Sequence, residues 1–209
     1  MTVMPLTDAN VDLDLLRRLR AGEALALTLL YKRHQTALYR FALLRTGSSD
    51  TAADVVQDVF MALIEGKLNF DPLRGALSSF LYGVARNFML KRAEGERRYL
   101  PFQHHKNEDD DEDCDVVDSA ATPLEKLLTS ERAEGVRAAL TQLAPHYRDV
   151  LILYEIQELS YVEIANICQI DIGTVRSRSS RARAKCARLL ADVNDDDCHE
   201  RRTKTSIER

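Results

Sequence analysis

The chain has 209 residues, of which 45% are hydrophobic and 30% charged, a composition typical of a globular rather than a disordered protein. There are only eight glycines and five prolines, and the apolar residues recur at helical spacing, which favours an all-α fold. No apolar run approaches the ~18 residues of a membrane span, and the N-terminus lacks the pattern of a secretory signal. We therefore expect a cytoplasmic protein without membrane insertion.

The net charge of −4 is unevenly distributed along the chain. Residues 108–118 hold eight carboxylates and no basic residue, so the rest of the chain carries a net charge of +4. Because a polyanion responds to local charge, the acidic average does not exclude a nucleic-acid partner.

The N-terminal half shows continuous helical periodicity from Val11 to Ala93. Glycines close the first two predicted helices, and Ser48, Ser49 and Asp50 are N-cap candidates for the third. Asn, Asp, Pro and Gly predict a loop over residues 69–75. The predicted helices cover residues 13–20, 25–44, 51–65 and 77–93, with Val55, Val56, Val59, Phe60, Leu63 and Ile64 on the buried face of the third.

Periodicity stops after Gly95 and resumes at Pro123, which suits the first turn of a helix. The intervening charged residues have little apolar area to offset their ordering entropy, which predicts a flexible acidic linker over 99–122. Further helices are predicted at 145–156, 160–168 and 174–191, and the polar tail 192–209 is expected to fray. The predicted architecture is two small helical domains, 11–98 and 123–191, joined by this linker.

Residues 161–178 have the spacing of a helix-turn-helix. Ser160 and Glu163 match a capping box, and Ala165 is small where two helices would cross. Val175, ten residues later, is apolar where the second helix must pack back on the first. The turn would place Gln169 at a positive φ, a conformation that usually favours glycine.

A basic run follows this motif, with six Arg or Lys residues and no acid between residues 176 and 188. Arginine can bind guanine through two hydrogen bonds, and the free amides at a helix start, near Thr174, can bind phosphate. A solvated basic face of an ordinary bundle is the alternative. The position of the run favours DNA binding by Thr174, Arg176, Ser177, Arg178, Ser180 and Arg181.

Several motifs together resemble sigma factors of the extracytoplasmic-function (ECF) type, within the sigma-70 family. Residues 54–63 (DVVQDVFMAL) resemble a helix of sigma region 2, and 70–75 with 80–87 resemble the stretch that follows it. Residues 141–190 are similar to sigma region 4. The resemblance covers roughly 25–98 and 124–190, in the order of the family.

The resemblance implies roles for two sets of residues in the N-terminal half, each of which could instead be solvated polar positions. Asp54, Gln57 and Asp58 would dock on the coiled coil of the largest subunit of RNA polymerase. Asn87 would lie where the family reads a flipped-out base of the −10 element, a task that suits an amide with both donor and acceptor. The residues that would hold the strand backbone are Arg86, Lys91, Arg92, Arg97 and Arg98.

Two features depart from the family pattern. Phe80 stands where the family commonly has Trp, and we expect it to be a core residue. The acidic linker is unusual, and it either mimics nucleic acid inside the polymerase or is a soluble tether.

The resemblance implies bacterial core RNA polymerase and promoter DNA as partners, and an anti-sigma factor as a regulator. A stand-alone helix-turn-helix regulator with an N-terminal ligand or dimerisation domain is the alternative, and a gel shift without polymerase separates the two. No phosphate loop, zinc spacing or nucleophile motif is present, so we expect no enzyme activity and no cofactor. We expect no metal site at His104, His105 and Cys114, and we expect Cys168 to pack in the core.

Overall fold

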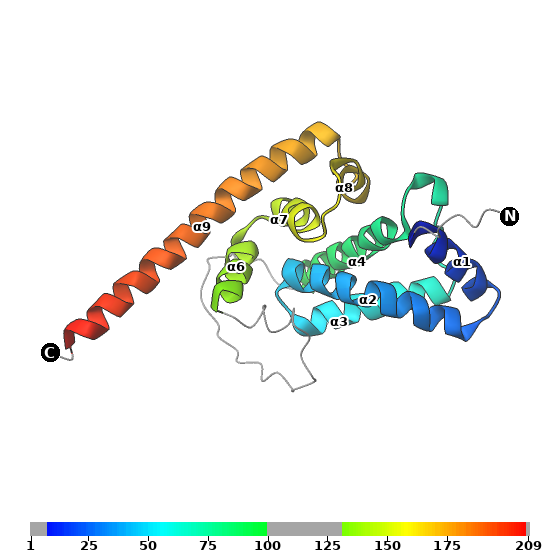
Figure 1. The fold of residues 1–209 in the computed structure, drawn as a ribbon, viewed down its shortest axis with the longest axis horizontal. Helices are drawn as coiled ribbons and strands as arrows, with labels where there is room; N and C mark the ends of the chain where they lie inside the picture. The colour runs from blue at the N-terminus through cyan, green and yellow to red at the C-terminus, as the bar shows by residue number, and fades with distance from the viewer. Residues whose placement is uncertain (1–7, 100–130, 208–209) are drawn as a thin grey trace.

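The computed structural model describes residues 8–99 and 131–207, and every regular element in these ranges is helical (Figure 1). The all-α prediction is confirmed. The predicted linker therefore lies almost wholly outside the described residues, as do Pro123, His104, His105 and Cys114. No helix in the described part is long and apolar enough to cross a bilayer.

The N-terminal half is a bundle in which α2 (Ala24–Thr46) packs against α1 (Asp8–Arg20), α3 (Ser49–Ile64) and α4 (Leu77–Tyr99). Its core contains Leu30, Phe41, Val55, Val59 and Leu81, each fully buried. A short 3₁₀ helix, η1 (Pro72–Arg74), lies in the predicted loop and is capped by the Asp71 carboxylate, which accepts from Leu73 N–H at 3.0 Å.

The expected helix ends are largely present in this half. Gly47 closes α2 with φ +76°, and Ser48 caps α3 by accepting from the amide of Thr51. Two expectations were wrong in detail. Ile64 is exposed, and α4 continues six residues past Ala93 because one helix-interior glycine, Gly95, costs only about 1 kcal/mol.

The C-terminal half contains α6 (Glu131–Gln142), α7 (Pro145–Leu151), α8 (Tyr161–Cys168) and α9 (Ile172–Ile207). A π-helical turn, η2 (Ile152–Ile156), continues α7. The core of the C-terminal half includes Ile152, Leu153, Ile164 and Val175. Cys168 is buried in this core, as expected, and burial raises the pKa of its thiol to about 11.

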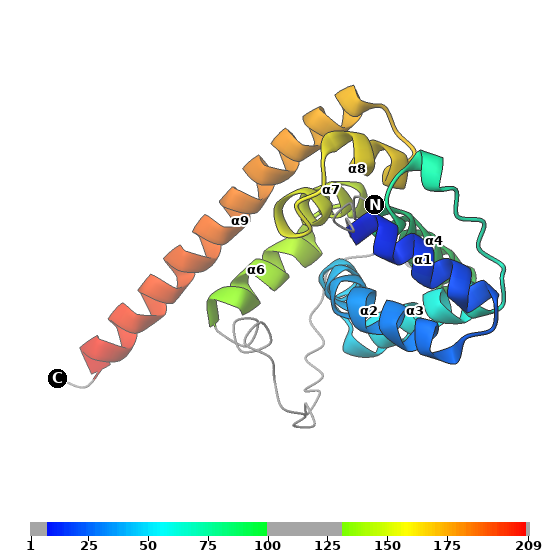
Figure 2. The ribbon, with the colours of Figure 1, turned by 45° about the vertical axis from the view of Figure 1, so that its right-hand side comes forward.

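The first part of α9 packs on α6, α7 and α8, and its C-terminal part extends beyond the rest of the molecule (Figures 1 and 2). Its backbone stays helical to Ile207, whereas a frayed tail was predicted from residue 192. The physical reason is that residues 174–209 contain neither Gly nor Pro, so no residue in this stretch forces the helix to stop.

The two halves pack against each other. Helix α8 contacts α4, and α2 contacts α6, α7 and η2. The sequence predicted two domains but not that they would touch, and this contact shapes the candidate site.

Candidate functional site

The helix-turn-helix is formed by α8 and the start of α9. The hydroxyl of Ser160 accepts from the amide of Glu163, and the Glu163 carboxylate accepts from the Ser160 amide at 2.9 Å, so the capping box is present. Gln169 has φ 56°, and its backbone N–H donates to the backbone carbonyl of Ala165. Ala165 and Val175 are both buried at the crossing of the two helices. The predicted motif is confirmed in its local geometry.

One face of α9 is open to solvent at the start of the helix. Arg176, Ser177, Ser180 and Arg181 are exposed, whereas Val175, Ser179 and Ala182 are buried. At about 100° per residue, the four exposed positions lie on one side of the helix and the buried ones on the other. Thr174 and Arg178 are half-buried at its border. The predicted DNA-contact set therefore lies together on or beside one accessible face.

Two further basic residues of this run, Arg183 and Lys185, contact other helices instead. The guanidinium of Arg183 donates to the carboxylate of Glu155 and stacks over the ring of Tyr154 at 4.8 Å from its centroid. The ammonium of Lys185 lies 4.9 Å from the centroid of Tyr147. These contacts fasten α9 to α7 and η2. The sequence analysis left Arg183 and Lys185 out of the predicted DNA-contact set, but it could not assign them these aromatic and acidic partners.

The exposed face of α3 carries the three residues predicted to dock on polymerase. Asp54 and Gln57 are exposed and Asp58 is half-exposed. Arg92 of α4, which was predicted to hold DNA, donates to both carboxylates, at 2.9 Å to Asp54 and 2.7 Å to Asp58. Hydrogen bonds to Asp54 and then Asp58 raise the pKa of Arg92. The structure thus brings together residues assigned to two different surfaces.

The other residues predicted on α4 divide into exposed and paired positions. Asn87 and Lys91 are exposed one turn apart, on the same side of the helix. Arg86 instead points into the contact between the halves, where its Nε lies 2.8 Å from Asp149 Oδ2. Arg97 and Arg98 lie in α4, beyond the described side chains.

Asp149 of α7 links the two halves through ion pairs to α2 and α4. Its second carboxylate oxygen accepts from Arg45 Nε at 2.6 Å, and its side chain is only 2% exposed. Tyr82 Oη donates to Gln157 at 2.7 Å, and Ser79 Oγ donates to Glu163 at 2.9 Å. Arg45 and Asp149 are 104 residues apart, and no local sequence pattern signals their pairing.

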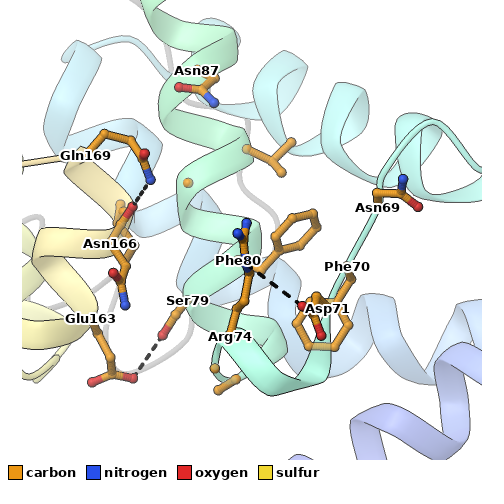
Figure 3. Close-up of a pocket in the computed structure, with 15 residues that line it drawn as sticks. Asn69, Phe70, Asp71, Arg74, Ser79, Phe80, Asn87, Glu163, Asn166 and Gln169 are labelled. Carbon is orange, nitrogen blue, oxygen red and sulfur yellow. Dashed lines mark hydrogen bonds and ion pairs between the residues drawn. The ribbon is translucent and has the colours of Figure 1, made fainter.

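A cleft lies beside this contact (Figure 3), between α4, the loop before it and α8. Asn87 is at one end, with Asn166 and Gln169 of α8 across from it and Ser79 bonded to Glu163 lower down. Burial alone would raise the pKa of Glu163, but hydrogen bonds from Ser160 and Ser79 together hold it below its usual value.

Phe80 lines the same cleft and packs on Phe70, with ring centroids 5.3 Å apart. It is half-buried and packs against the core from its edge, so it meets the expectation of a core residue only in part. The ring is at the edge of the bundle, because the loop that covers it leaves one side open to the cleft.

Comparison with known proteins agrees with this geometry. A family model described as "Sigma-70 region 2" matches residues 30–99, and one described as "Sigma-70, region 4" matches residues 133–186. The first covers the bundle from α2 to α4, and the second covers the helix-turn-helix and the exposed face of α9. These two regions in this order define the sigma-70 class of protein.

Similar proteins of known family identify the group to which the chain belongs within the sigma-70 class. The chain is 30% identical over 185 residues to the ECF RNA polymerase sigma factor SigM of Mycobacterium tuberculosis, covering 88% of this chain and 86% of that protein. It is 24% identical over 180 residues to the ECF sigma factor SigW of Bacillus subtilis, covering 85% and 96%. The chain belongs to the ECF family of RNA polymerase sigma factors.

Two solved structures share the fold. One is CnrH in complex with the cytosolic domain of CnrY, with a TM-score of 0.61, 24% identity, and coverage of 87% of this chain and 98% of that one. The other is the sigma factor RpoE of Bartonella quintana in complex with the anti-sigma factor NepR, with a TM-score of 0.59, 24% identity, and coverage of 78% and 96%.

Proposed function

We propose that the chain directs core RNA polymerase to promoters by using three separate surfaces, one for the polymerase and two for DNA. The observation that carries this proposal is that one chain presents a solvent-exposed Arg and Ser face on α9, an exposed amide on α4 and an acidic face on α3. No catalytic step is assigned to it, and its place of action is the cytoplasm, where the polymerase works.

The acidic face of α3 is the proposed polymerase contact. Asp54 and Asp58 are held side by side by Arg92, so their remaining oxygens are positioned before a partner arrives. Gln57 lies exposed on the same helix. A basic partner surface could exchange hydrogen bonds with this set. We therefore assign Arg92 to the polymerase surface. It could contact DNA only after its bonds to Asp54 and Asp58 break.

The α4 surface is the proposed reader of the unpaired −10 strand. The exposed amide of Asn87 can donate and accept on a base edge, and Lys91, one turn further on, can contact a phosphate. Arg86 would join them once released from Asp149, and Arg97 and Arg98 extend the proposed set.

The α9 face is the proposed reader of the −35 duplex. Its N-terminal turn enters the major groove in the manner of a recognition helix, with Arg176 and Arg181 toward bases or phosphates and Ser177 and Ser180 between them. Thr174 and Arg178 flank this face.

An anti-sigma factor is the proposed regulator. The RpoE relative was solved with the anti-sigma factor NepR, and CnrH was solved with the cytosolic domain of CnrY. We extend to this chain the expectation of such a partner.

Run-off transcription with purified core polymerase on a randomised promoter library tests the proposal. Selection of a promoter with two conserved blocks is expected, and transcription without selection of such blocks would overturn it. The Gln57→Ala variant should lower retention of the chain on immobilised core polymerase. Asn87→Ala should leave that retention unchanged and lower promoter opening.

A further inference from the structure

We propose that the free chain holds itself closed through an Asp149 clamp, formed by Asp149, Arg45 and Arg86, which keeps single-stranded DNA away from α4. This inference rests on the proposed function of α4 as the reader of the −10 strand. The clamp is an interaction between the two halves of the same chain.

The geometry of Asp149 supports a role in closure rather than in folding of its own half. Each carboxylate oxygen accepts from a different arginine, at 2.6 Å from Arg45 on α2 and 2.8 Å from Arg86 on α4. Both partners belong to the N-terminal half, whereas Asp149 lies on α7. A carboxylate that is 2% exposed needs such partners, because an unpaired buried charge is strongly unfavourable. Burial of Asp149 therefore depends on the docking of the halves.

Further hydrogen bonds join the two halves. Tyr82 Oη donates to Gln157, and Ser79 Oγ donates to Glu163. The guanidinium of Arg148 donates to the carbonyl of Arg45. These named contacts across the halves are polar, and polar groups can be rehydrated when the halves separate, whereas the buried apolar residues of the two halves form one cluster that opening would have to divide. The polar share of the contact is what suits it to reversible opening.

The closed arrangement competes with DNA for the same groups. The guanidinium of Arg86 would bind a phosphate, but in the closed chain the Asp149 carboxylate takes that place and leaves the Arg86 side chain 15% exposed. Asn87 itself stays exposed, yet Asn166 and Gln169 of α8 stand across the cleft from it (Figure 3). A strand that follows α4 from Lys91 past Asn87 toward the loop before α4 would run into α8. Closure and strand binding are therefore mutually exclusive on this surface.

The fraction of free chains in the open form sets how much closure weakens binding of single-stranded DNA. If only a small fraction of free chains is open, the apparent affinity for single-stranded DNA is lowered by that fraction. Loss of one partner from a buried charge pair shifts such an equilibrium by a factor of about ten or more. Asp149→Asn retains the shape of the side chain but leaves Arg45 and Arg86 close together without a counter-charge, so it favours the open form.

The test uses the full chain and two readouts, solution X-ray scattering and titration of a fluorescent random-sequence 20-nucleotide DNA strand. Asp149→Asn should raise the radius of gyration and tighten strand binding about tenfold or more. Tyr82→Phe removes one interdomain hydrogen bond without a charge change and should shift both readouts in the same direction, by less. Asp14→Asn removes an exposed carboxylate on α1 and controls for the general effect of net charge.

The outcomes separate the inference from the function on which it rests. An expanded Asp149→Asn chain with tighter strand binding, and an unchanged Asp14→Asn chain, supports the clamp. A natural chain already expanded in solution, or an Asp149→Asn chain as compact and as weakly binding as the natural one, overturns it. Failure of the promoter library to yield a two-block promoter overturns the proposed function, while the scattering result still decides whether Asp149 closes the chain.

Discussion

The capping box at the start of α8 gives the most direct test of the helix-turn-helix. Ser160→Ala removes two hydrogen bonds, the one that Ser160 Oγ accepts from the Glu163 amide and the 2.8 Å bond it donates to the Glu163 carboxylate. Loss of an N-cap hydroxyl costs about 1 kcal/mol, and the second bond adds a similar amount at most, since Ser160 is exposed. We expect a loss of about 1–2 kcal/mol in the free energy of unfolding, or about 2–8 °C in Tm.

Urea unfolding followed by circular dichroism measures this change. Ser49→Ala is the matched control, because Ser49 lies exposed in the first turn of α3 and, within the described residues, its side chain forms a single long hydrogen bond, 3.4 Å to the neighbouring Asp50. The control should change stability by less than about 0.5 kcal/mol. If the Ser160→Ala variant is as stable as its control, the cap does not hold α8 in solution and the reasoning from its geometry is wrong.

Three further predictions concern the same domain. Gln169→Gly relieves the positive φ at the turn, worth about 1–2 kcal/mol, and gives up the side-chain bond to the Asn166 carbonyl, so Tm should stay level or rise; a clearly lower Tm would contradict the turn assignment. Arg181→Ala should weaken promoter-duplex binding and reduce the slope of log affinity against log salt concentration by about 1, as filter binding at several salt concentrations would show. Arg183→Ala should lower Tm and leave that slope unchanged, because Arg183 is bonded to Glu155 and stacks over Tyr154. Equal slopes in the two variants would refute the assignment of Arg181 to DNA and of Arg183 to helix packing. Because the pKa of Glu163 is lowered in the folded chain, its ionised form adds stability above its ordinary pKa, and this contribution is lost as pH falls through the folded value. The natural chain should therefore lose more stability than Glu163→Gln between about pH 6 and pH 3 in urea titrations, and parallel curves would show that the carboxylate does not matter.

The sequence alone determined where most helices lie, the helix-turn-helix and the resemblance to the family, but not how far α4 and α9 extend. These features depend on neighbours in the chain: apolar residues at helical spacing, a glycine such as Gly47 at a helix end, and Ser160 three residues before Glu163. The exposed positions of α9 that were predicted to contact DNA followed from the same periodicity, because Val175 and Ala182 had to face inward.

Only the tertiary structure decided how charged residues pair. Arg86 and Arg92 looked alike in the sequence, yet one is held by Asp149 of the other half and the other bridges Asp54 and Asp58 of α3. Arg183 belongs to the same basic run as the predicted DNA contacts, yet it is held by Glu155 and Tyr154. The physical reason is that helical periodicity records which side of a helix is buried but not which distant residue lies against it. A partner 63 or 104 residues away becomes a neighbour only when the helices have packed.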